Sequence, residues 1–126
     1  MGIMSRTKYL ICTATVNGPY RLQSFLESVY LYTDYQRTPF QVAITDDSSR
    51  PDLAEQNYQL AIQYSCFYIR NKERSGVPYS WNRAAELADS EFIIISNDDI
   101  IICPGWLDAF DHFWEANRHL KLGVLA

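Results

Sequence analysis

The sequence predicts an α/β fold with a mostly parallel sheet flanked by helices. Short apolar, β-branched runs alternate along the chain with amphipathic segments, which is the pattern of successive βαβ units with right-handed crossovers. The chain has 126 residues, of which 48% are hydrophobic. This length is sufficient for one core that buries roughly two-thirds of the unfolded surface. We therefore expect a single domain over residues 1–126.

The first part of the chain predicts two strands and the helix between them. The first strand covers residues 8–15, which are apolar and β-branched, and the turn residues 17–19 forbid its continuation. A helix begins at Pro19, and a second strand over residues 40–45 ends at the carboxylate pair Asp46-Asp47. The helix carries an apolar stripe at i, i+3, i+4 and i+7, formed by Leu22, Phe25, Leu26 and Val29.

The middle of the chain predicts a helix, a short strand and another helix. Pro51 opens the first helix, which ends before a third strand at residues 66–69. Residues 70–80 form a loop with the densest group of positive charges in the chain, and a helix with small residues then packs on the sheet. The inward positions are Leu53, Leu60, Ala61 and Tyr64 in the first helix and Trp81, Ala84, Ala85 and Ala88 in the second.

The last third contains the run 92–99, in which apolar residues stop abruptly at two carboxylates. This pattern predicts a buried parallel strand that delivers an acidic tip to a loop. Pro104 begins a last helix with an aromatic stripe that we expect in the core. The apolar run 122–126 predicts a further strand, and its free edge would let copies of the chain form an oligomer.

Composition excludes several classes of function. The net charge is −4 and no basic stripe is present, so we do not expect a nucleic-acid-binding surface. No apolar run approaches the roughly 20 residues of a membrane span, and the first residues lack a signal-peptide core, so we expect a cytoplasmic protein. The cysteines lack metal-ligand spacing and are expected to be reduced and mostly buried. They are Cys12, Cys66 and Cys103.

The ends of the predicted strands bring polar residues to one edge of the sheet. If the strand order is 3-2-1-4, the first and fourth strands are neighbours across a topological switch point, where ligands of such sheets bind. Thr15, Asp47, Asp98 and Asp99 would then line one groove. Adjacent ionised aspartates repel each other, and carboxylate oxygens suit hard cations, so we expect Mg²⁺ or Mn²⁺ here. The alternative is a structural Asx-turn and helix cap.

A carboxylate on the second strand and a metal on the fourth would recognise different parts of a sugar nucleotide. The carboxylate accepts hydrogen bonds from a base or a ribose, and the metal bridges a diphosphate. The motifs of other sites are missing from the sequence: it has no Gly-x-Gly-x-x-Gly, no Gly-x-x-x-x-Gly-Lys and no Ser/His/Asp set.

Several segments occur in the same order and spacing as in family 2 glycosyltransferases. They are Ile11-Cys12-Thr13-Ala14-Thr15-Val16-Asn17, Val42-Ala43-Ile44-Thr45-Asp46-Asp47-Ser48-Ser49, Asn71, Gly76, Trp81-Asn82-Arg83-Ala84 and Ile95-Ser96-Asn97-Asp98-Asp99. Over nearly all of residues 9–126, the chain resembles the nucleotide-binding half of the family's GT-A fold, a Rossmann-like mostly parallel sheet.

The resemblance implies that the chain binds a nucleotide-diphospho-sugar donor and transfers the sugar to an acceptor hydroxyl, as in polysaccharide biosynthesis. It also implies a role for each matching residue. Thr15 and Asn17 border the nucleotide, Asp47 accepts a hydrogen bond from the base, Asn97 and Asp98 face the ribose and phosphates, and Asp99 binds Mn²⁺ or Mg²⁺. Inverting transfer also needs a general base, which the family carries in a second half together with the acceptor site. The catalytic residue of this chain is therefore unknown.

The sequence departs from the family pattern at two motifs. Ala14-Thr15-Val16-Asn17 stands where the family has Pro-Thr-Tyr-Asn, so an aromatic ring that could stack on the base is missing. Asn97 replaces the first aspartate of the family's Asp-x-Asp signature, which removes one acidic contact but leaves Asp99 as a ligand.

Three other functions are alternatives to glycosyl transfer. A non-catalytic module would bind a nucleotide or sugar nucleotide without turning it over. A phospho-receiver-like domain also places an acidic pair near a metal, but a phosphoacceptor aspartate and its lysine are not evident. A nucleotidyltransferase would carry a Gly-rich phosphate loop after the first strand, and this loop is absent.

Overall fold

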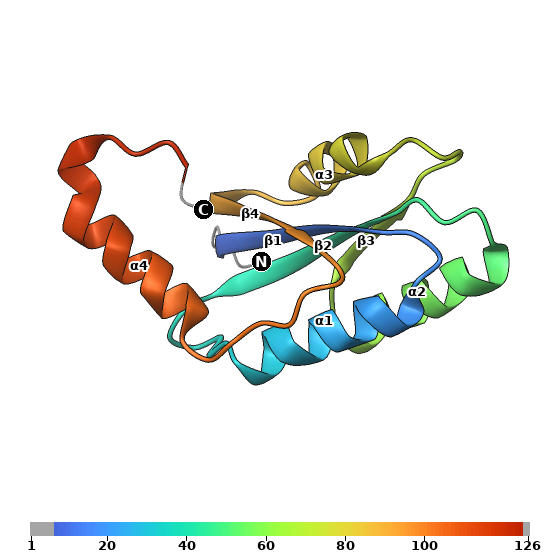
Figure 1. Ribbon diagram of the computed structural model, residues 1–126, viewed down its shortest axis with the longest axis horizontal. Helices are drawn as coiled ribbons and strands as arrows, with labels where there is room; N and C mark the ends of the chain where they lie inside the picture. Colours follow the sequence, from blue (N-terminus) through green and yellow to red (C-terminus); the bar gives the residue numbers. More distant parts are fainter. Residues whose placement is uncertain (1–6, 125–126) are drawn as a thin grey trace, which may run out of the picture.

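The computed structural model describes residues 7–124, in which strands and helices alternate along the chain (Figure 1). No helix in this part of the chain has the length and apolar character needed to cross a membrane. The elements are β1 (Thr7–Thr15), α1 (Pro19–Leu31), β2 (Phe40–Asp46), α2 (Pro51–Gln63), β3 (Phe67–Arg70), α3 (Val77–Ala85), β4 (Ser90–Asn97), α4 (Trp106–Asn117) and the 3-10 turn η1 (Arg118–Leu120).

The strands form one parallel sheet in the order β3-β2-β1-β4, which confirms the predicted order and fold class. In the register of the sheet, Ile11 of β1 lies beside Val42 of β2 and Ile94 of β4. Because all the strand pairs are parallel, the carboxyl ends of the strands share one edge, which lies towards the right in Figure 1. The chain passes from β1 through α1 to β2 on one side of β1, and later from β3 through α3 to β4 on the other side. This reversal makes the β1–β4 boundary a topological switch point.

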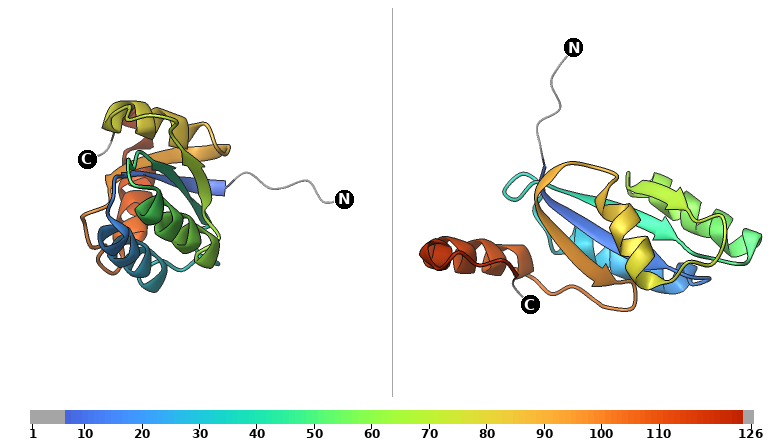
Figure 2. Two further views of the ribbon diagram at one scale, coloured as in Figure 1. Left: turned by 90° about the vertical axis from the view of Figure 1, so that its right-hand side faces the viewer. Right: turned by 90° about the horizontal axis from the view of Figure 1, so that it is seen from above.

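Helices cover the two faces of the sheet unequally. Figures 1 and 2 show α1 and α2 on one face and α3 on the other. Under α3, Leu10, Cys12 and Ala43 of the sheet form a small buried cluster with Ala84. Because side chains alternate along a strand, the next residues of β1 and β2 point to the opposite face, where α1 covers them.

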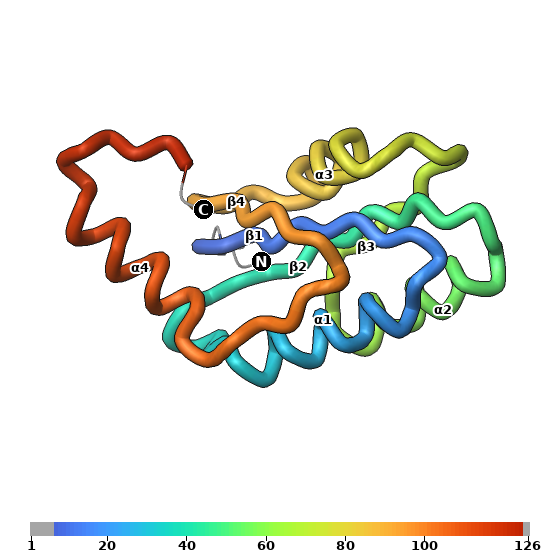
Figure 3. The backbone as a smooth tube through the Cα atoms, in the orientation of Figure 1, coloured from blue at the N-terminus to red at the C-terminus, as the bar shows by residue number. Residues whose placement is uncertain are grey.

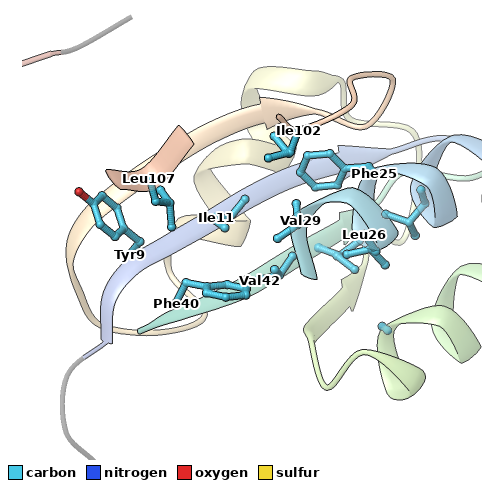
Figure 4. Close-up of a cluster of buried hydrophobic side chains, with 12 residues drawn as sticks. Tyr9, Ile11, Phe25, Leu26, Val29, Phe40, Val42, Ile102 and Leu107 are labelled. Atoms are coloured by element: carbon cyan, nitrogen blue, oxygen red, sulfur yellow. The ribbon is translucent and has the colours of Figure 1, made fainter. Parts of the chain in front are cut away.

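The main core lies between the sheet and α1 (Figure 4). The helical stripe predicted from the sequence is confirmed, because all four of its side chains are fully buried. Two residues that follow β4, Ile102 and Leu107, complete this core from the far end of the chain. The buried members are Tyr9, Ile11, Leu22, Phe25, Leu26, Val29, Phe40, Val42, Ile44, Ala61, Ile102 and Leu107.

The segment between β4 and α4 runs back along α1 to the amino-terminal end of the sheet (Figure 3). Two hydrogen bonds hold it there. The backbone N–H of Ile102 donates to Oγ of Ser28 at 2.9 Å, and Nε1 of Trp106 donates to Oγ1 of Thr33 at 2.8 Å. As a result α4 lies beyond the amino ends of the strands, and the opposite edge of the sheet is formed by the strand tips and their loops.

The run 92–99 forms a parallel strand with an acidic tip, as predicted, but the expectation that this strand is buried is wrong for one of its two faces. β4 is the outermost strand on its side of the described sheet, and α3 covers β1 and β2 rather than β4. Ile93 and Ile95 are therefore 52% and 55% exposed. Only the face that carries Phe92 and Ile94 packs on the core.

The expected last strand is also absent over residues 122–124, and residues 125–126 lie outside the described part of the chain. Leu122 and Val124 instead line an apolar groove beside β4, together with Phe92 and Trp114. Leu122 is half-buried there, whereas Val124 remains 84% exposed. The last helix begins at Trp106 rather than at Pro104, because Gly105 adopts a left-handed conformation with φ of +79°.

The burial of the remaining predicted positions varies. Cys12 is buried, Cys66 is half-buried and Cys103 is exposed, and all three thiols are free. On α4, Trp106 and Phe110 pack against the main core, whereas Phe113 is 49% exposed. The aromatic stripe of α4 therefore contributes to the core through only part of its length.

Two phenylalanines on helices, Phe25 of α1 and Phe113 of α4, provide a matched test of this core. Phe25→Ala is expected to lower the free energy of unfolding by about 3 to 5 kcal/mol, since a fully buried ring leaves a cavity. Phe113→Ala is expected to cost less than about 1 kcal/mol, because half of the ring is already in solvent. Urea denaturation measures both, and equal losses would contradict the described core.

Candidate functional site

The residues predicted to form a site all lie at the carboxyl edge of the sheet. Thr15 ends β1 and Asn17 follows it, Asp47 follows β2, and Asn97 ends β4 with two aspartates directly after it. The loop between β3 and α3, residues 71–76, closes the same edge. Hydrogen bonds of buried polar side chains join these strand tips and loops.

Asp46 is a structural anchor for the tip of β2. Its side chain is fully buried, and Oδ2 accepts hydrogen bonds from the hydroxyl of Tyr68 at 2.6 Å and from Nδ2 of Asn57 at 3.1 Å. Oδ1 accepts the backbone N–H of Ser48 at 2.9 Å, which is an Asx-turn. Burial and the neighbouring Asp46 carboxylate raise the pKa of Tyr68, so this hydroxyl remains a donor. Asp46 is therefore a structural carboxylate.

Asp47 fastens the β3–α3 loop. Only 3% of the residue is exposed. Oδ1 accepts hydrogen bonds from Nδ2 of Asn71 at 2.9 Å and from the backbone N–H of Ser75 at 2.8 Å. Oδ2 accepts the backbone N–H of Gly76 at 2.9 Å, and Nε of Arg74 lies 3.3 Å away. A base that bonds to Asp47 therefore has to share or displace one of these donors.

The pKa of Asp47 reflects these contacts. Burial by itself raises the pKa of the carboxyl group, but the hydrogen bonds from Asn71, Gly76 and Ser75 and the charge of Arg74 act in the other direction. Their combined effect exceeds that of burial, so the pKa of Asp47 lies below its ordinary value. Asp47 is thus ionised in the folded chain at neutral pH.

Asn71 extends this network to α3. Its Nδ2 also donates to Oγ of Ser80 at 3.0 Å, and its Oδ1 accepts a hydrogen bond from NH1 of Arg83 at 2.8 Å. Asn71 and Gly76 were identified from the sequence only by resemblance. Charge and periodicity gave no indication that these two residues contact the second strand.

Asn17 joins the loop after β1 to the loop after β2. It has a positive φ of +49°, a conformation that asparagine tolerates better than most residues. Its backbone N–H donates to Oγ of Ser48 at 2.7 Å, and its Nδ2 donates to Oγ of Ser49 at 3.0 Å. Its Oδ1 accepts the backbone N–H of Arg50 at 3.1 Å. Asn17 therefore fixes the shape of two loops at once.

Thr15 connects β1 to both neighbouring strand tips. Its backbone carbonyl accepts the N–H of Asp47 at 2.8 Å. Its hydroxyl, which is buried, donates to Oδ2 of Asp98 at 2.8 Å. The predicted meeting of the first and fourth strands at one groove is thus made through a direct side-chain contact.

Arg21 is the site residue that sequence reasoning missed. It lies in the first turn of α1, and its Nε approaches Oδ1 of Asp98 at 3.6 Å. Its NH2 group donates to the backbone carbonyl of Val16 at 2.8 Å. A positive side chain at a helix N-terminus opposes the helix dipole. This unfavourable position was the one sequence signal that Arg21 has an acidic partner.

Asp98 is held in a less favourable environment than Asp47. Burial raises the pKa of its carboxyl group, and the adjacent charge of Asp99 acts in the same direction. The hydrogen bond from Thr15 and the charge of Arg21 lower it without cancelling these effects. The ionised form of Asp98 therefore gains from any additional positive charge at this edge.

Asn97 and Asp99 are exposed beside Asp98. Within residues 7–124, the carboxylate of Asp99 forms no hydrogen bond and no ion pair. The same residues contain no cluster of three or more His, Cys, Asp or Glu side chains that could hold a metal by themselves. A lone exposed carboxylate does fit Mg²⁺ or Mn²⁺, because such ions are commonly held by one or two carboxylates together with substrate phosphates and water.

Two substitutions separate the roles of the aspartates. Since the pKa of Asp47 is lower in the folded chain than in the unfolded chain, ionised Asp47 stabilises the fold above the unfolded value. This contribution is lost as the pH falls through the folded-state value. Asp47→Asn is expected to cost about 1 to 3 kcal/mol at pH 7, and the difference from the unmodified chain should shrink below about pH 4.

Asp98→Asn is the contrasting variant. The raised pKa means that the ionised form costs stability as the pH rises through the folded-state value. Asparagine still accepts a hydrogen bond from Thr15, so the variant should be as stable as the unmodified chain at pH 7 or more stable. Urea denaturation at pH values between about 3 and 7, at intervals of about one pH unit, measures the stability of both variants. A loss of stability in Asp98→Asn as large as that in Asp47→Asn would contradict this division.

The fold is similar to that of solved glycosyltransferase structures. A crystal structure of S. aureus TarS residues 1–349 superposes with a TM-score of 0.74 at 23% sequence identity, covering 89% of this chain and 33% of that chain. The same protein in complex with UDP-GlcNAc gives 0.74 at 22% identity, covering 89% and 32%. The mannosyltransferase PcManGT from Pyrobaculum calidifontis, in complex with GDP-Man and Mn²⁺, gives 0.69 at 20% identity, covering 82% and 31%.

These likenesses concern the fold, and the chain spans about a third of the length of each of these structures. No match is found among curated protein sequences. The family model described as "Glycosyl transferase family 2" matches residues 10–122, a span that includes every strand tip described above. With this match and a parallel sheet of GT-A type, the chain belongs to glycosyl transferase family 2.

Proposed function

We propose that residues 1–126 form a nucleotide-sugar-binding domain of a glycosyltransferase, with the donor diphosphate held at the carboxyl ends of β1 and β4. The observation that carries this proposal is that four aspartates at this edge differ in their hydrogen-bond partners and in their exposure. Asp46 and Asp47 are satisfied by buried donors, and Asp98 is bonded to Thr15. Asp99 alone among them is exposed without a partner in the described chain, so it is free to bind a ligand.

The metal in this proposal is Mn²⁺ or Mg²⁺, and Asp99 is the residue that would hold it. When bound, such an ion supplies positive charge that offsets a diphosphate and favours its departure. Asp98 lies next to Asp99 in a buried position where extra positive charge is favourable, which supports the same location. A mannosyltransferase of similar fold is described in complex with Mn²⁺.

Other residues of the edge would bind the nucleotide. Thr15 and Asn17 border the site from the β1 side, and Asn97 is exposed beside Asp98, where it can reach a ribose or a phosphate. Asp47 would accept a hydrogen bond from the base once Arg74, its most exposed partner, moves aside. Structures of similar fold contain either UDP-GlcNAc or GDP-Man, so we propose a hexosyl donor and leave its base open.

Transfer also requires a base that activates the acceptor hydroxyl. Asp46 is fully buried. Asp108 lies on α4 at the opposite end of the sheet, where it pairs with Arg37. Neither carboxylate can therefore meet an acceptor at this edge. We propose that the acceptor site and the base lie in a part of the enzyme that is not in this chain. The chain alone would then bind the donor without efficient transfer.

The first test is isothermal titration of the chain with UDP and with GDP, each with and without Mn²⁺. We expect binding of one of them that is at least about tenfold tighter with Mn²⁺, because an ion held by Asp99 would supply positive charge to the diphosphate. Asp99→Asn should remove this metal dependence. Asp108→Asn, an exposed aspartate at the opposite end of the sheet, is the matched control and should bind like the unmodified chain.

The outcomes of this titration separate the proposed functions. A folded chain that binds neither nucleotide, or an Asp99→Asn variant with unchanged metal dependence, would contradict the proposal. Binding without hydrolysis or transfer of a sugar nucleotide, even when an acceptor is supplied, would favour a non-catalytic binding module instead.

The edge of β4 supports a second, structural proposal, that copies of the chain associate through it. No strand in the described part of the chain pairs with this edge, and two large apolar side chains, Ile93 and Ile95, are exposed on it. Sedimentation velocity over a range of concentrations should detect a dimer, and Ile95→Lys should shift the equilibrium towards monomer. A chain that remains monomeric at all concentrations would contradict association through β4.

A further inference from the structure

We propose that Arg21 binds the phosphate groups of the nucleotide ligand, so that the site recognises the diphosphate with a guanidinium in addition to the metal at Asp99. This inference rests on the proposed function and adds a residue to it. It comes from three features of the structure: the position of the Arg21 side chain, the space that Gly18 leaves for it, and the way its charge is balanced.

The position of Arg21 is unusual for a helix residue. Its side chain turns back from the first turn of α1 over the β1–α1 loop, where NH2 donates to the carbonyl of Val16 at 2.8 Å. Its Nε approaches Asp98 at 3.6 Å. The guanidinium therefore lies at the β1–β4 boundary, beside the aspartate that precedes the proposed metal ligand.

Gly18 leaves the space that the guanidinium occupies. A Cβ atom built on Gly18 would overlap NH2 and Cζ of Arg21. The backbone of Gly18 has φ of −136°, so it does not require glycine for conformational reasons. Among the described residues, the nearest atoms that a side chain at position 18 would meet are those of Arg21.

The charge of Arg21 is only partly balanced by Asp98. The side chain of Arg21 is 50% exposed, and its contact with the carboxylate is long. Such a half-exposed pair contributes little to stability, so the guanidinium can exchange or share its partner at small cost. Its remaining N–H groups are available for a second anion, and a guanidinium matches phosphate oxygens in a bidentate manner.

The other arginines of the edge have different assignments. Arg74 contacts Asp47, Arg83 donates to Asn71, and Arg70 donates to the carbonyl of Ser48, so all three belong to the β2–β3 side. On the β1–β4 side, Arg21 is the positive group that the described residues place beside Asp98. A diphosphate held at Asp99 would therefore meet Arg21 rather than these three.

The experiment compares ligands that differ only in their phosphates. Uridine, UMP and UDP, and the corresponding guanosine series, are titrated in the presence of Mn²⁺ into the unmodified chain, Arg21→Ala and Arg21→Lys. Arg21→Ala should weaken diphosphate binding by about tenfold to hundredfold and leave nucleoside binding unchanged. Arg21→Lys should fall between, because it keeps the charge but loses the planar donor pair.

Gly18→Ala provides an independent variant that moves the guanidinium without removing it. It should weaken diphosphate binding in the same direction as Arg21→Ala. The double variant Gly18→Ala/Arg21→Ala should bind no worse than Arg21→Ala alone, because both changes act on one group. Arg37→Ala removes a similar exposed arginine, paired with Asp108 at the opposite end of the sheet, and is the matched control.

Each outcome of these titrations decides the proposal. Equal diphosphate affinity in Arg21→Ala and the unmodified chain would overturn the role of Arg21 while leaving the proposed function intact. An equal loss for nucleoside and diphosphate would overturn it as well, since it would indicate that Arg21 acts through Asp98 or the loop. A folded chain that binds no nucleoside diphosphate overturns both proposals, and thermal melts of every variant identify those that fail to fold.

Discussion

The carboxyl edge of the sheet depends on how the buried negative charge at the tip of β2 is compensated. Asp46 and Asp47 are adjacent in the sequence, but successive side chains of a strand point to opposite faces. Asp46 therefore meets Tyr68 and Asn57, whereas Asp47 meets Asn71 and the loop before α3. Each carboxylate holds a different segment at the strand tip through hydrogen bonds, because a buried charge is stable only with several donors around it. The position of the β3–α3 loop follows from this requirement.

The tip of β4 is built on the opposite principle. Asp98 has one hydrogen bond and one long ion pair, and its neighbour Asp99 has no partner in the described chain. The same pair of residue types thus gives a closed network at one strand and an incomplete one two strands away. Incomplete compensation of charge is a property expected of a binding site, and it lies where the topology of the sheet reverses direction.

The core explains why this edge is accessible. The segment after β4 is bound along α1 through Ser28 and Thr33, and it carries α4 to the amino-terminal end of the strands. There Leu107 completes the main core and Trp114 contacts Phe92. The helix that follows the acidic tip therefore stabilises the fold at one end of the sheet and leaves the other end to the loops that carry the candidate site.

The sequence predicted the strand and helix order, the stripe of α1 and the location of every acidic tip, because these depend on local periodicity and on turn residues. It could not distinguish Asp46 from Asp47, identify Arg21, or recognise β4 as an edge strand. It also predicted a strand over residues 122–126, and the described part of this run, residues 122–124, forms none. These features depend on contacts between residues distant in the chain, such as Thr15 with Asp98. Such contacts form when the helices and strands pack together, since burial and charge compensation are properties of the packed chain.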